Sequence, residues 1–202
     1  MLIALRVTLV TLVLTGVLYP VVITAVAQVL FPGRANGSLV RDGRGAVVGS
    51  ELIAQKFAGA AYFQPRPSAA GDAGYDATAS GGSNLGPTSR KLRTRVAGSV
   101  ARLRAENPEA PGPVPVELVT TSGSGLDPHL APAAARWQVP RIARARGVDA
   151  TRVAGVVDAN VESRDLGVLG EPRVNVLLLN MALDRHFGRP PAAPPTRPVA
   201  GR

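Results

Sequence analysis

The stretch that decides the architecture of this chain is Val7 to Phe31, which reads VTLVTLVLTGVLYPVVITAVAQVLF and contains no charged side chain. A helix needs about 20 mainly apolar residues to cross the hydrocarbon core of a bilayer. The stretch meets that requirement. We therefore expect residues 1–6 to form a short N-terminal segment and residues 7–31 to form one transmembrane helix.

A secretory signal peptide is the alternative interpretation of the same residues. Ala25, Val26 and Ala27 form the small-residue pattern that precedes a signal-peptidase cut, and Arg6 supplies a positively charged n-region. The uncharged run exceeds the roughly 7 to 15 residues of an ordinary h-region, however, and Pro20 lies in its middle. A retained anchor is therefore favoured. Cleavage after Ala27 stays open as the rival hypothesis, and it would release a secreted binding protein or enzyme.

The composition of the stretch favours a helix that packs against other transmembrane helices. Pro20 removes one intrahelical hydrogen bond and is expected to kink the helix, which membranes tolerate when a hydroxyl or a neighbouring helix satisfies the freed carbonyl. Small and hydroxylic residues let another helix approach closely. They occur along the whole stretch, at Thr8, Thr11, Thr15, Gly16 and Thr24.

The charges at the two ends of the helix do not fix its orientation. Arg6 precedes the helix, whereas Arg34, Arg41 and Arg44 follow it, so neither end is clearly the more positive. Long domains are also translocated largely regardless of such charges. The charge rule therefore leaves both orientations open.

Beyond the helix, the chain has room for one soluble domain. About 170 residues remain, which is an ordinary domain size. The net charge of +9 suggests nucleic acid, but the arginines are scattered, aromatic residues make up 4%, and the lysines are Lys56 and Lys91. We therefore expect no nucleic-acid binding. The lack of cysteine removes disulfides and thiol catalysis. The Pro-rich tail of residues 188–202 is expected to be disordered.

Residues 32–187 mix strand-like and helix-like patterns, so we expect an α+β domain. Arg41 to Val48 has the turn residues of a short hairpin. A helix with regularly spaced apolar residues is expected from its cap, Ser89, to about Asn107. Val116 to Thr121 alternates like a buried strand.

The later residues predict further short elements. Asp127 is expected to cap a helix over Leu130 to Trp137, and Pro140 is expected to restart a second helix that ends at Arg146. Asp149 can cap the next helix. Arg173 to Leu179 is an apolar run that is either a strand feeding a turn of helix or part of one buried helix, and its periodicity does not distinguish them.

Ser68 to Thr88 lacks the periodicity of a helix or strand, and a loop of this length inside a domain is usually functional. Within it, Gly81 to Thr88 has the glycine and threonine positions of a phosphate-binding loop. Pro87 stands where that loop needs its lysine, and proline has no amide proton to donate. We therefore expect a structural loop, although its backbone amides could still bind an anion.

Ser122, Ser124, Asp127 and His129 crowd one turn and include the residue types of a hydrolytic triad. A nucleophile elbow needs glycine two residues before its serine, and position 122 is serine. Three triad members within one short loop also do not usually converge with the base between the other two. The only other histidine, His186, lies far away in sequence. We expect neither a catalytic set nor a metal site.

Trp137 to Pro140 are expected to join the two short helices, with Trp137 in the core. Gln138 could hydrogen-bond a ligand or cap a backbone carbonyl, and the residues alone favour the second role. A membrane helix suited to packing, a loop-rich domain and no evident catalytic set together indicate an accessory subunit of a membrane complex.

Long stretches of the chain closely resemble the C subunit of the bacterial Kdp potassium-transporting ATPase. The residues that carry the resemblance are TGVLYP at 15–20, ANGSL at 35–39, GSELI at 49–53, SGGSNLGP at 80–87, the stretch Val116 to Gln138, and GEPRVNVLLLN at 170–180. The likeness covers nearly the whole chain up to His186, and motifs of this length and order are highly specific.

The resemblance implies a single-span, non-catalytic subunit of a high-affinity complex that imports potassium across the cell inner membrane with energy from ATP. The partners it implies are a channel-like potassium-binding subunit, a P-type ATP-hydrolysing subunit and a small single-span subunit, besides membrane lipid. In the family this subunit stabilises the assembly and is described as a catalytic chaperone that raises the ATP affinity of the hydrolysing subunit. No cofactor of its own is implied, and ATP enters only through the complex.

The resemblance also implies nucleotide contacts, through a Ser-Gly-Gly loop likened to an ABC signature and through a glutamine. On this sequence they map to Ser80, Gly81, Gly82, Ser83, Asn84 and Gln138. Ser83 and Asn84 depart from the last part of that signature, which weakens the likeness.

With the help of the resemblance we expect a cytoplasmic N-terminus and an extracytoplasmic domain. A domain placed there cannot touch cytoplasmic ATP, so chaperoning would act through the conformation of the complex. We expect the glycine-rich loop Ser80 to Pro87 and the turn Ser122 to His129 to form the surface that docks on the channel-like subunit.

Overall fold

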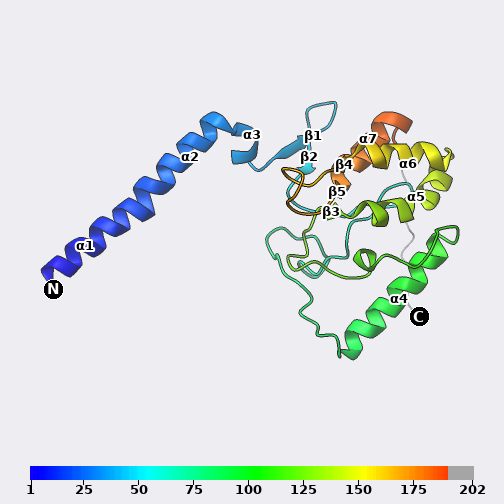
Figure 1. The fold of residues 1–202 in the computed structure, drawn as a ribbon, viewed down its shortest axis with the longest axis horizontal. Coiled ribbons are helices and arrows are strands. Elements are labelled where there is room, and N and C mark those ends of the chain that lie inside the picture. Colours follow the sequence, from blue (N-terminus) through cyan, green and yellow to red (C-terminus); the bar gives the residue numbers. More distant parts are fainter. Residues whose placement is uncertain (191–202) are drawn as a thin grey trace, which may run out of the picture. The chain divides into compact units, whose positions relative to one another are not determined.

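The computed structural model describes residues 1–190 and divides the chain into two compact units, Met1–Leu52 and a second that begins at Ile53 (Figure 1). The chain mixes helices and small sheets and has one apolar N-terminal helix, as the sequence predicts. Residues 191–202 of the predicted tail lie outside the described residues. Before them, the Gly188 amide donates to the Asp184 carbonyl and the Arg189 guanidinium lies 3.7 Å from the Asp184 carboxylate.

The first unit begins with one continuous helix of 29 residues, Leu2–Leu30. It comprises α1 (Leu2–Val13), a π-helical turn η1 (Leu14–Leu18) and α2 (Tyr19–Leu30). Its mean hydropathy is 2.3, and none of its most apolar window is buried within the chain. By length and composition, this helix can cross a membrane.

Pro20 changes the hydrogen-bond register of the helix and does not end it. The Tyr19 amide donates to the Leu14 carbonyl, as in a π turn, and the Thr15 hydroxyl donates to the Thr11 carbonyl at 2.8 Å. The wider turn makes room for the proline ring, which clashes with a carbonyl of the preceding turn in a regular α-helix. The disturbance expected at Pro20 is thus a π turn, and the ribbon continues through it (Figure 1).

A short helix and a hairpin complete the first unit. Helix α3 (Pro32–Ala35) follows the apolar helix, and strands β1 (Leu39–Arg41) and β2 (Val47–Ser50) pair antiparallel. The Asp42 carboxylate accepts the amides of Arg44 and Ala46 and so closes the turn. The predicted hairpin is confirmed, and it belongs to the compact unit that contains the apolar helix.

The second unit surrounds a small antiparallel sheet with helices. Its strands are β3 (His129–Leu130), β4 (Val161–Glu162) and β5 (Arg173–Asn175), in the order β3-β5-β4. Its helices are α4 (Arg90–Glu106), η2 (Val116–Leu118), α5 (Pro132–Arg146), α6 (Ala150–Ala159) and α7 (Val176–Phe187). The fully buried apolar core includes Phe63, Leu130, Ile142, Val153, Leu179 and Leu183.

Two helix starts with a capping side chain were predicted correctly. The Ser89 hydroxyl accepts the Leu92 amide at the start of α4, and the Asp149 carboxylate accepts the Thr151 amide at the start of α6. The apolar run from Arg173 forms a strand that feeds a helix, which is the first of the two predicted alternatives. Strand β5 feeds directly into α7, whose first turn is capped by Asn175.

The predicted strand at Val116 to Thr121 is wrong. These residues form the 3₁₀ turn η2, after which the Thr120 amide donates to the Val116 carbonyl. Leu118 and Val119 are both buried. Two adjacent residues can both point inward from a tight turn, whereas a strand would send them to opposite faces.

The predicted pair of helices around Pro140 is also wrong. The Asp127 carboxylate accepts the His129 amide and pairs with Arg66, and the helix begins later, at Pro132. Pro140 lies inside α5, where proline costs about 3 kcal/mol. Buried residues on both sides of it, among them Trp137 and Ile142, pack into the core and offset that cost.

Side chains from α5 and α7 satisfy the backbone of an irregular segment, Ala60–Gln64, which belongs to no helix or strand. The Asn180 amide accepts the Phe63 N–H at 2.8 Å and donates to the Phe63 carbonyl at 2.9 Å. The Gln138 amide likewise accepts the Gln64 N–H at 2.8 Å and donates to the Gln64 carbonyl at 3.0 Å. The carbonyls of residues 60, 61 and 62 accept from Arg141 and Arg146. We call this set of contacts the backbone clamp.

Replacing Asn180 with alanine is expected to lower the free energy of unfolding of the second unit by about 2–4 kcal/mol, because two buried backbone groups lose their partners. Urea unfolding of the full-length chain in detergent, followed by the fluorescence of Trp137, its only tryptophan, measures the change. Asn160→Ala is the matched control, since Asn160 bonds one carbonyl in its own helix. It is expected to cost less than about 1 kcal/mol, and equal losses would contradict the clamp.

Candidate functional site

The structure brings the glycine-rich loop against the turn that follows η2. The Gly81 amide donates to the Ser124 carbonyl at 2.8 Å, and the Ser80 hydroxyl donates to the same carbonyl at 3.1 Å. The hydroxyls of Thr121 and Ser83 bond each other at 3.2 Å. The two segments expected to share one surface, around residues 80–87 and 122–129, are thus in direct contact.

Close backbone packing at two glycines holds this contact together. A Cβ atom at Gly82 would lie 3.0 Å from the Gly123 carbonyl oxygen. One at Gly125 would lie 2.6 Å from the Gly81 carbonyl oxygen and 2.8 Å from the Ala70 nitrogen, and Gly125 also has a φ of +68°. Only glycine fits these places without a shift of the backbone.

A shallow groove of about 520 Å³ runs between the two segments. It is lined by Gly82, Ser83, Asn84, Leu85, Gly86, Thr121, Ser122 and Gly123. Two arginines bond to its walls, Arg95 to the Ser83 hydroxyl at 3.4 Å and Arg66 to the Thr121 carbonyl at 3.2 Å. The groove therefore offers hydroxyls and backbone groups on a fixed framework, which suits hydrogen bonding to another surface.

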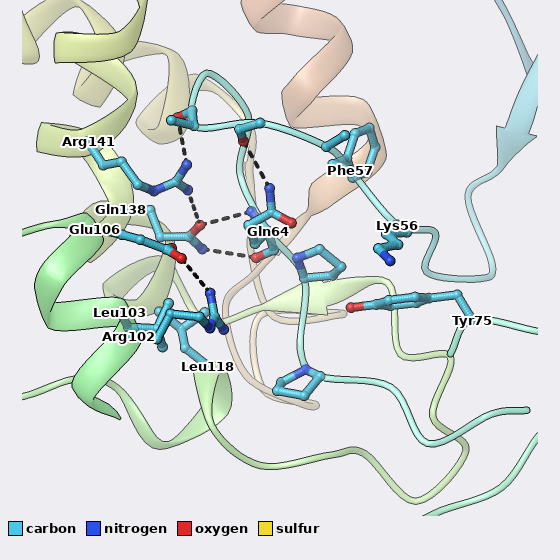
Figure 2. Close-up of a pocket in the computed structure, with 15 residues that line it drawn as sticks. Lys56, Phe57, Gln64, Tyr75, Arg102, Leu103, Glu106, Leu118, Gln138 and Arg141 are labelled. Atoms are coloured by element: carbon cyan, nitrogen blue, oxygen red, sulfur yellow. Dashed lines mark hydrogen bonds and ion pairs between the residues drawn. The ribbon is translucent and has the colours of Figure 1, made fainter. Parts of the chain in front are cut away.

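Gln138 does not join this groove. It lies in α5, is 2% exposed, and lines a separate cavity of about 660 Å³ (Figure 2). The cavity lies between α4, α5 and the segment around Phe57–Pro67, and its other polar lining residues are Lys56, Gln64, Tyr75, Arg102, Glu106 and Arg141. The six residues to which the resemblance assigns nucleotide contact thus lie in two different places.

The amide of Gln138 is engaged by the protein itself. Its oxygen accepts the Gln64 N–H at 2.8 Å and an Arg141 N–H at 2.9 Å, and its nitrogen donates to the Gln64 carbonyl at 3.0 Å. An amide oxygen has two lone pairs, and both are used here. Gln138 therefore caps a backbone carbonyl, and a nucleotide could contact its oxygen only by displacing one of these bonds.

The charged groups of the cavity are largely committed as well. Arg102 and Glu106 form an ion pair at 2.9 Å, and the Arg141 guanidinium donates to backbone carbonyls. Burial lowers the pKa of Arg141, although the side chain stays charged at neutral pH. Burial raises the pKa of Tyr75, which keeps its hydroxyl protonated as it donates to the Arg66 carbonyl. Among the charged lining residues, Arg102, Glu106 and Arg141 are thus bonded within the chain, whereas Lys56 makes no ion pair with the described residues.

The serine-rich turn does not have the geometry of a hydrolytic triad. The Ser122 hydroxyl lies 3.4 Å from the Ser124 hydroxyl, and His129 lies 3.7 Å from the Asp127 carboxylate, which Arg66 also contacts. Among the bonds of residues 1–190, none joins either serine hydroxyl to His129. In the same residues, no group of three or more His, Cys, Asp or Glu side chains is placed to hold a metal ion.

Sequence reasoning missed the residues of α5 and α7 whose side chains bond the backbone of Ala60–Gln64. Arg141, Arg146 and Asn180 were not singled out, although Asn180 interrupts the apolar run LLLNMAL, and a polar residue in such a run indicates a buried partner. No sequence pattern identifies that partner as Phe63, because the two residues lie 117 positions apart.

Gln138→Ala is expected to lower the free energy of unfolding of the second unit by about 2–4 kcal/mol, since the N–H and carbonyl of the half-buried Gln64 lose their partners and Arg141 loses one acceptor. Gln64→Ala is the matched control. It removes a side chain that makes one hydrogen bond among the described residues, to the exposed Gly59 carbonyl, and it leaves the Gln64 backbone in the clamp. It is expected to cost less than about 1 kcal/mol. Urea unfolding followed by Trp137 fluorescence compares the two, and a stable Gln138→Ala variant would refute the structural role.

The comparisons with known proteins agree with the resemblance seen in the sequence. The family model described as KdpC, K⁺-transporting ATPase, c chain, matches residues 1–185. The potassium-transporting ATPase KdpC subunit of Myxococcus xanthus is 69% identical over 199 residues, which cover 98% of this chain and 93% of that protein.

Other relatives carry the same name. The subunit of Rhodospirillum rubrum is 57% identical over 174 residues, covering 86% of this chain and 89% of the relative. The subunit of Caulobacter vibrioides is 56% identical over 181 residues, covering 90% of this chain and 89% of the relative. The rival hypothesis of a secreted binding protein or enzyme finds no support in these matches. The chain belongs to the KdpC family, the c chain of the K⁺-transporting ATPase.

Proposed function

We propose that this chain is the accessory, non-catalytic subunit of a high-affinity potassium import complex, and that it stabilises the assembly of the ATP-hydrolysing and channel-like subunits. The observation that carries the proposal is the family match over residues 1–185, which includes the apolar helix Leu2–Leu30. The contacts of Ser122, Ser124 and His129 support a non-catalytic role, because the serine hydroxyls bond each other and His129 faces Asp127.

The proposed placement is a single pass through the cell inner membrane, with the N-terminus in the cytoplasm and the second unit outside. The uncharged helix and the early Arg6 are compatible with it. On that side the second unit does not meet cytoplasmic ATP. A chaperone effect on ATP affinity would then act through the conformation of the complex, and the Gln138 amide oxygen, whose two lone pairs are both used, agrees with such an indirect role.

Site-directed labelling tests this placement, and the natural chain is suited to it because it has no cysteine. Asp72→Cys, in the second unit, is expected to react with a membrane-impermeant maleimide in intact spheroplasts. Leu2→Cys, at the start of α1, is expected to react only after permeabilisation. The reverse pattern would place the second unit in the cytoplasm, where direct contact with ATP becomes possible.

The proposed docking surface is the groove between the glycine-rich loop and the turn from Ser122 to His129. The two segments fix each other through backbone bonds, as at Gly81 and Ser124, so the surface exists before a partner arrives. Its uncharged hydroxyls and backbone groups suit a partner surface that is also uncharged and carries hydrogen-bonding groups. The proposed partner is the channel-like subunit.

Gly81→Trp is expected to reduce the amount of channel-like subunit that copurifies with the tagged chain by about 10-fold or more. Gly81 suits the test because a Cβ there meets only the Ala79 carbonyl, at 4.0 Å, whereas one at Gly82 strikes backbone. The matched control is Gly98→Trp on exposed α4, where nothing lies within 4 Å of the added Cβ. It is expected to leave copurification unchanged. Normal copurification with Gly81→Trp would argue against docking at this groove.

A further inference from the structure

The loop between β4 and β5 exposes a cluster of apolar side chains. Leu166 is 90% exposed, Val168 73% and Leu169 58%. Beyond Ile53, the other large apolar residue in the described chain with such exposure is Val116, which stands alone in sequence. Single exposed apolar residues are normal on protein surfaces, whereas neighbouring ones on one loop mark an interaction site.

Backbone bonds and ion pairs hold this loop in one shape. Asp165 and Leu169 exchange two backbone hydrogen bonds, both of 2.9 Å, and form an isolated β-bridge. At the base of the loop, Arg164 pairs with Glu171 at 2.8 Å, and Arg173 pairs with Asp165 at 3.4 Å and with Glu162 at 3.0 Å. The apolar tip is therefore presented on a preformed support.

Leu166 has a backbone conformation that leucine normally avoids. Its φ is +53°, in the left-handed region where a Cβ is unfavourable and which glycine adopts freely. Packing within this chain does not offset the cost of that conformation, because the Leu166 side chain is almost fully exposed. A strained residue that is also exposed indicates a contact made elsewhere.

The charges and the size of the tip restrict what covers it. Arg164 and Arg173 are engaged in ion pairs, and residues 163–170 contain no aromatic side chain, so the usual handles for a lipid headgroup are missing. A stable pairing of two copies needs about 800 Å² from each partner, more than three aliphatic side chains supply. The contact therefore belongs to a protein that other contacts already hold beside this chain.

We propose that Leu166, Val168 and Leu169 form an apolar plug that inserts into an uncharged apolar pocket on another subunit of the potassium-transporting complex. The inference rests on the proposed function and adds a second contact, made of different residues from those of the glycine-loop groove. The ion-paired base positions the plug, and the aliphatic tip makes the contact.

Crosslinking within the purified complex identifies what covers the plug. The full-length Val168→Cys chain, labelled with benzophenone maleimide before reassembly, is irradiated, and the crosslinked peptides are read by mass spectrometry. A crosslink from position 168 to apolar residues of another subunit is the expected result. Crosslinks only to lipid, only to a second copy of this chain, or to nothing would overturn the proposal.

Affinity measurements test whether the plug contributes to binding. Leu166→Gly removes the side chain and relieves the backbone conformation, so the variant is expected to melt no lower than the natural chain. Its half-saturating concentration for reassembly with complex that lacks this chain is expected to rise about 10-fold. Val168→Ser is expected to weaken binding in the same direction, and the matched control Val116→Ser is expected to leave it unchanged.

The outcomes separate this inference from the proposed function. If the natural chain and Val116→Ser reassemble normally and both plug variants do so equally well, the plug is wrong and the accessory role stands. If the natural chain itself does not associate with the other subunits, the proposed function fails, and the plug fails with it.

Discussion

The second unit depends on how the backbone of one irregular segment, Ala60–Gln64, is hydrogen-bonded without a neighbouring strand. An unpaired buried N–H or carbonyl costs about 1–3 kcal/mol, and Phe63, in the middle of this segment, is fully buried and has both its backbone groups bonded by Asn180. Amide and guanidinium groups from α5 and α7 take the place of the missing strand. Both helices must therefore be in place before the segment is stable, which couples the helical core to the loop region.

The same segment fixes the loops that follow it. Arg66 comes two residues after Gln64, and its guanidinium reaches both the Thr121 carbonyl and the Asp127 carboxylate. The Tyr75 hydroxyl donates to the Arg66 carbonyl. The region from Ile53 to Ser89 has neither helix nor strand, yet it presents a defined surface because its polar groups bond to residues that the core holds in place.

The sequence predicted two helix starts, which local chemistry marks. Ser89 and Asp149 start helices because their side chains bond amides within the next turn. The predictions failed where distant contacts decide, as at Pro140, whose helix continues because its neighbours pack in the core. The juxtaposition of the glycine-rich loop and the serine-rich turn was anticipated. The separate position of Gln138 was not, since its partner Gln64 lies 74 positions away.

Backbone strain lies mainly outside the core of this chain. Among residues 1–190, the non-glycine residues with positive φ are Ser38, Tyr75, Asn84 and Leu166. Asn84 lines the groove and Leu166 forms the exposed tip of the β4–β5 loop. Asparagine tolerates this conformation, whereas leucine does not, so Leu166 is the costlier of the two. A strongly bonded core can hold a strained residue at an exposed position. The free energy of binding to a partner can then offset the cost of the strain.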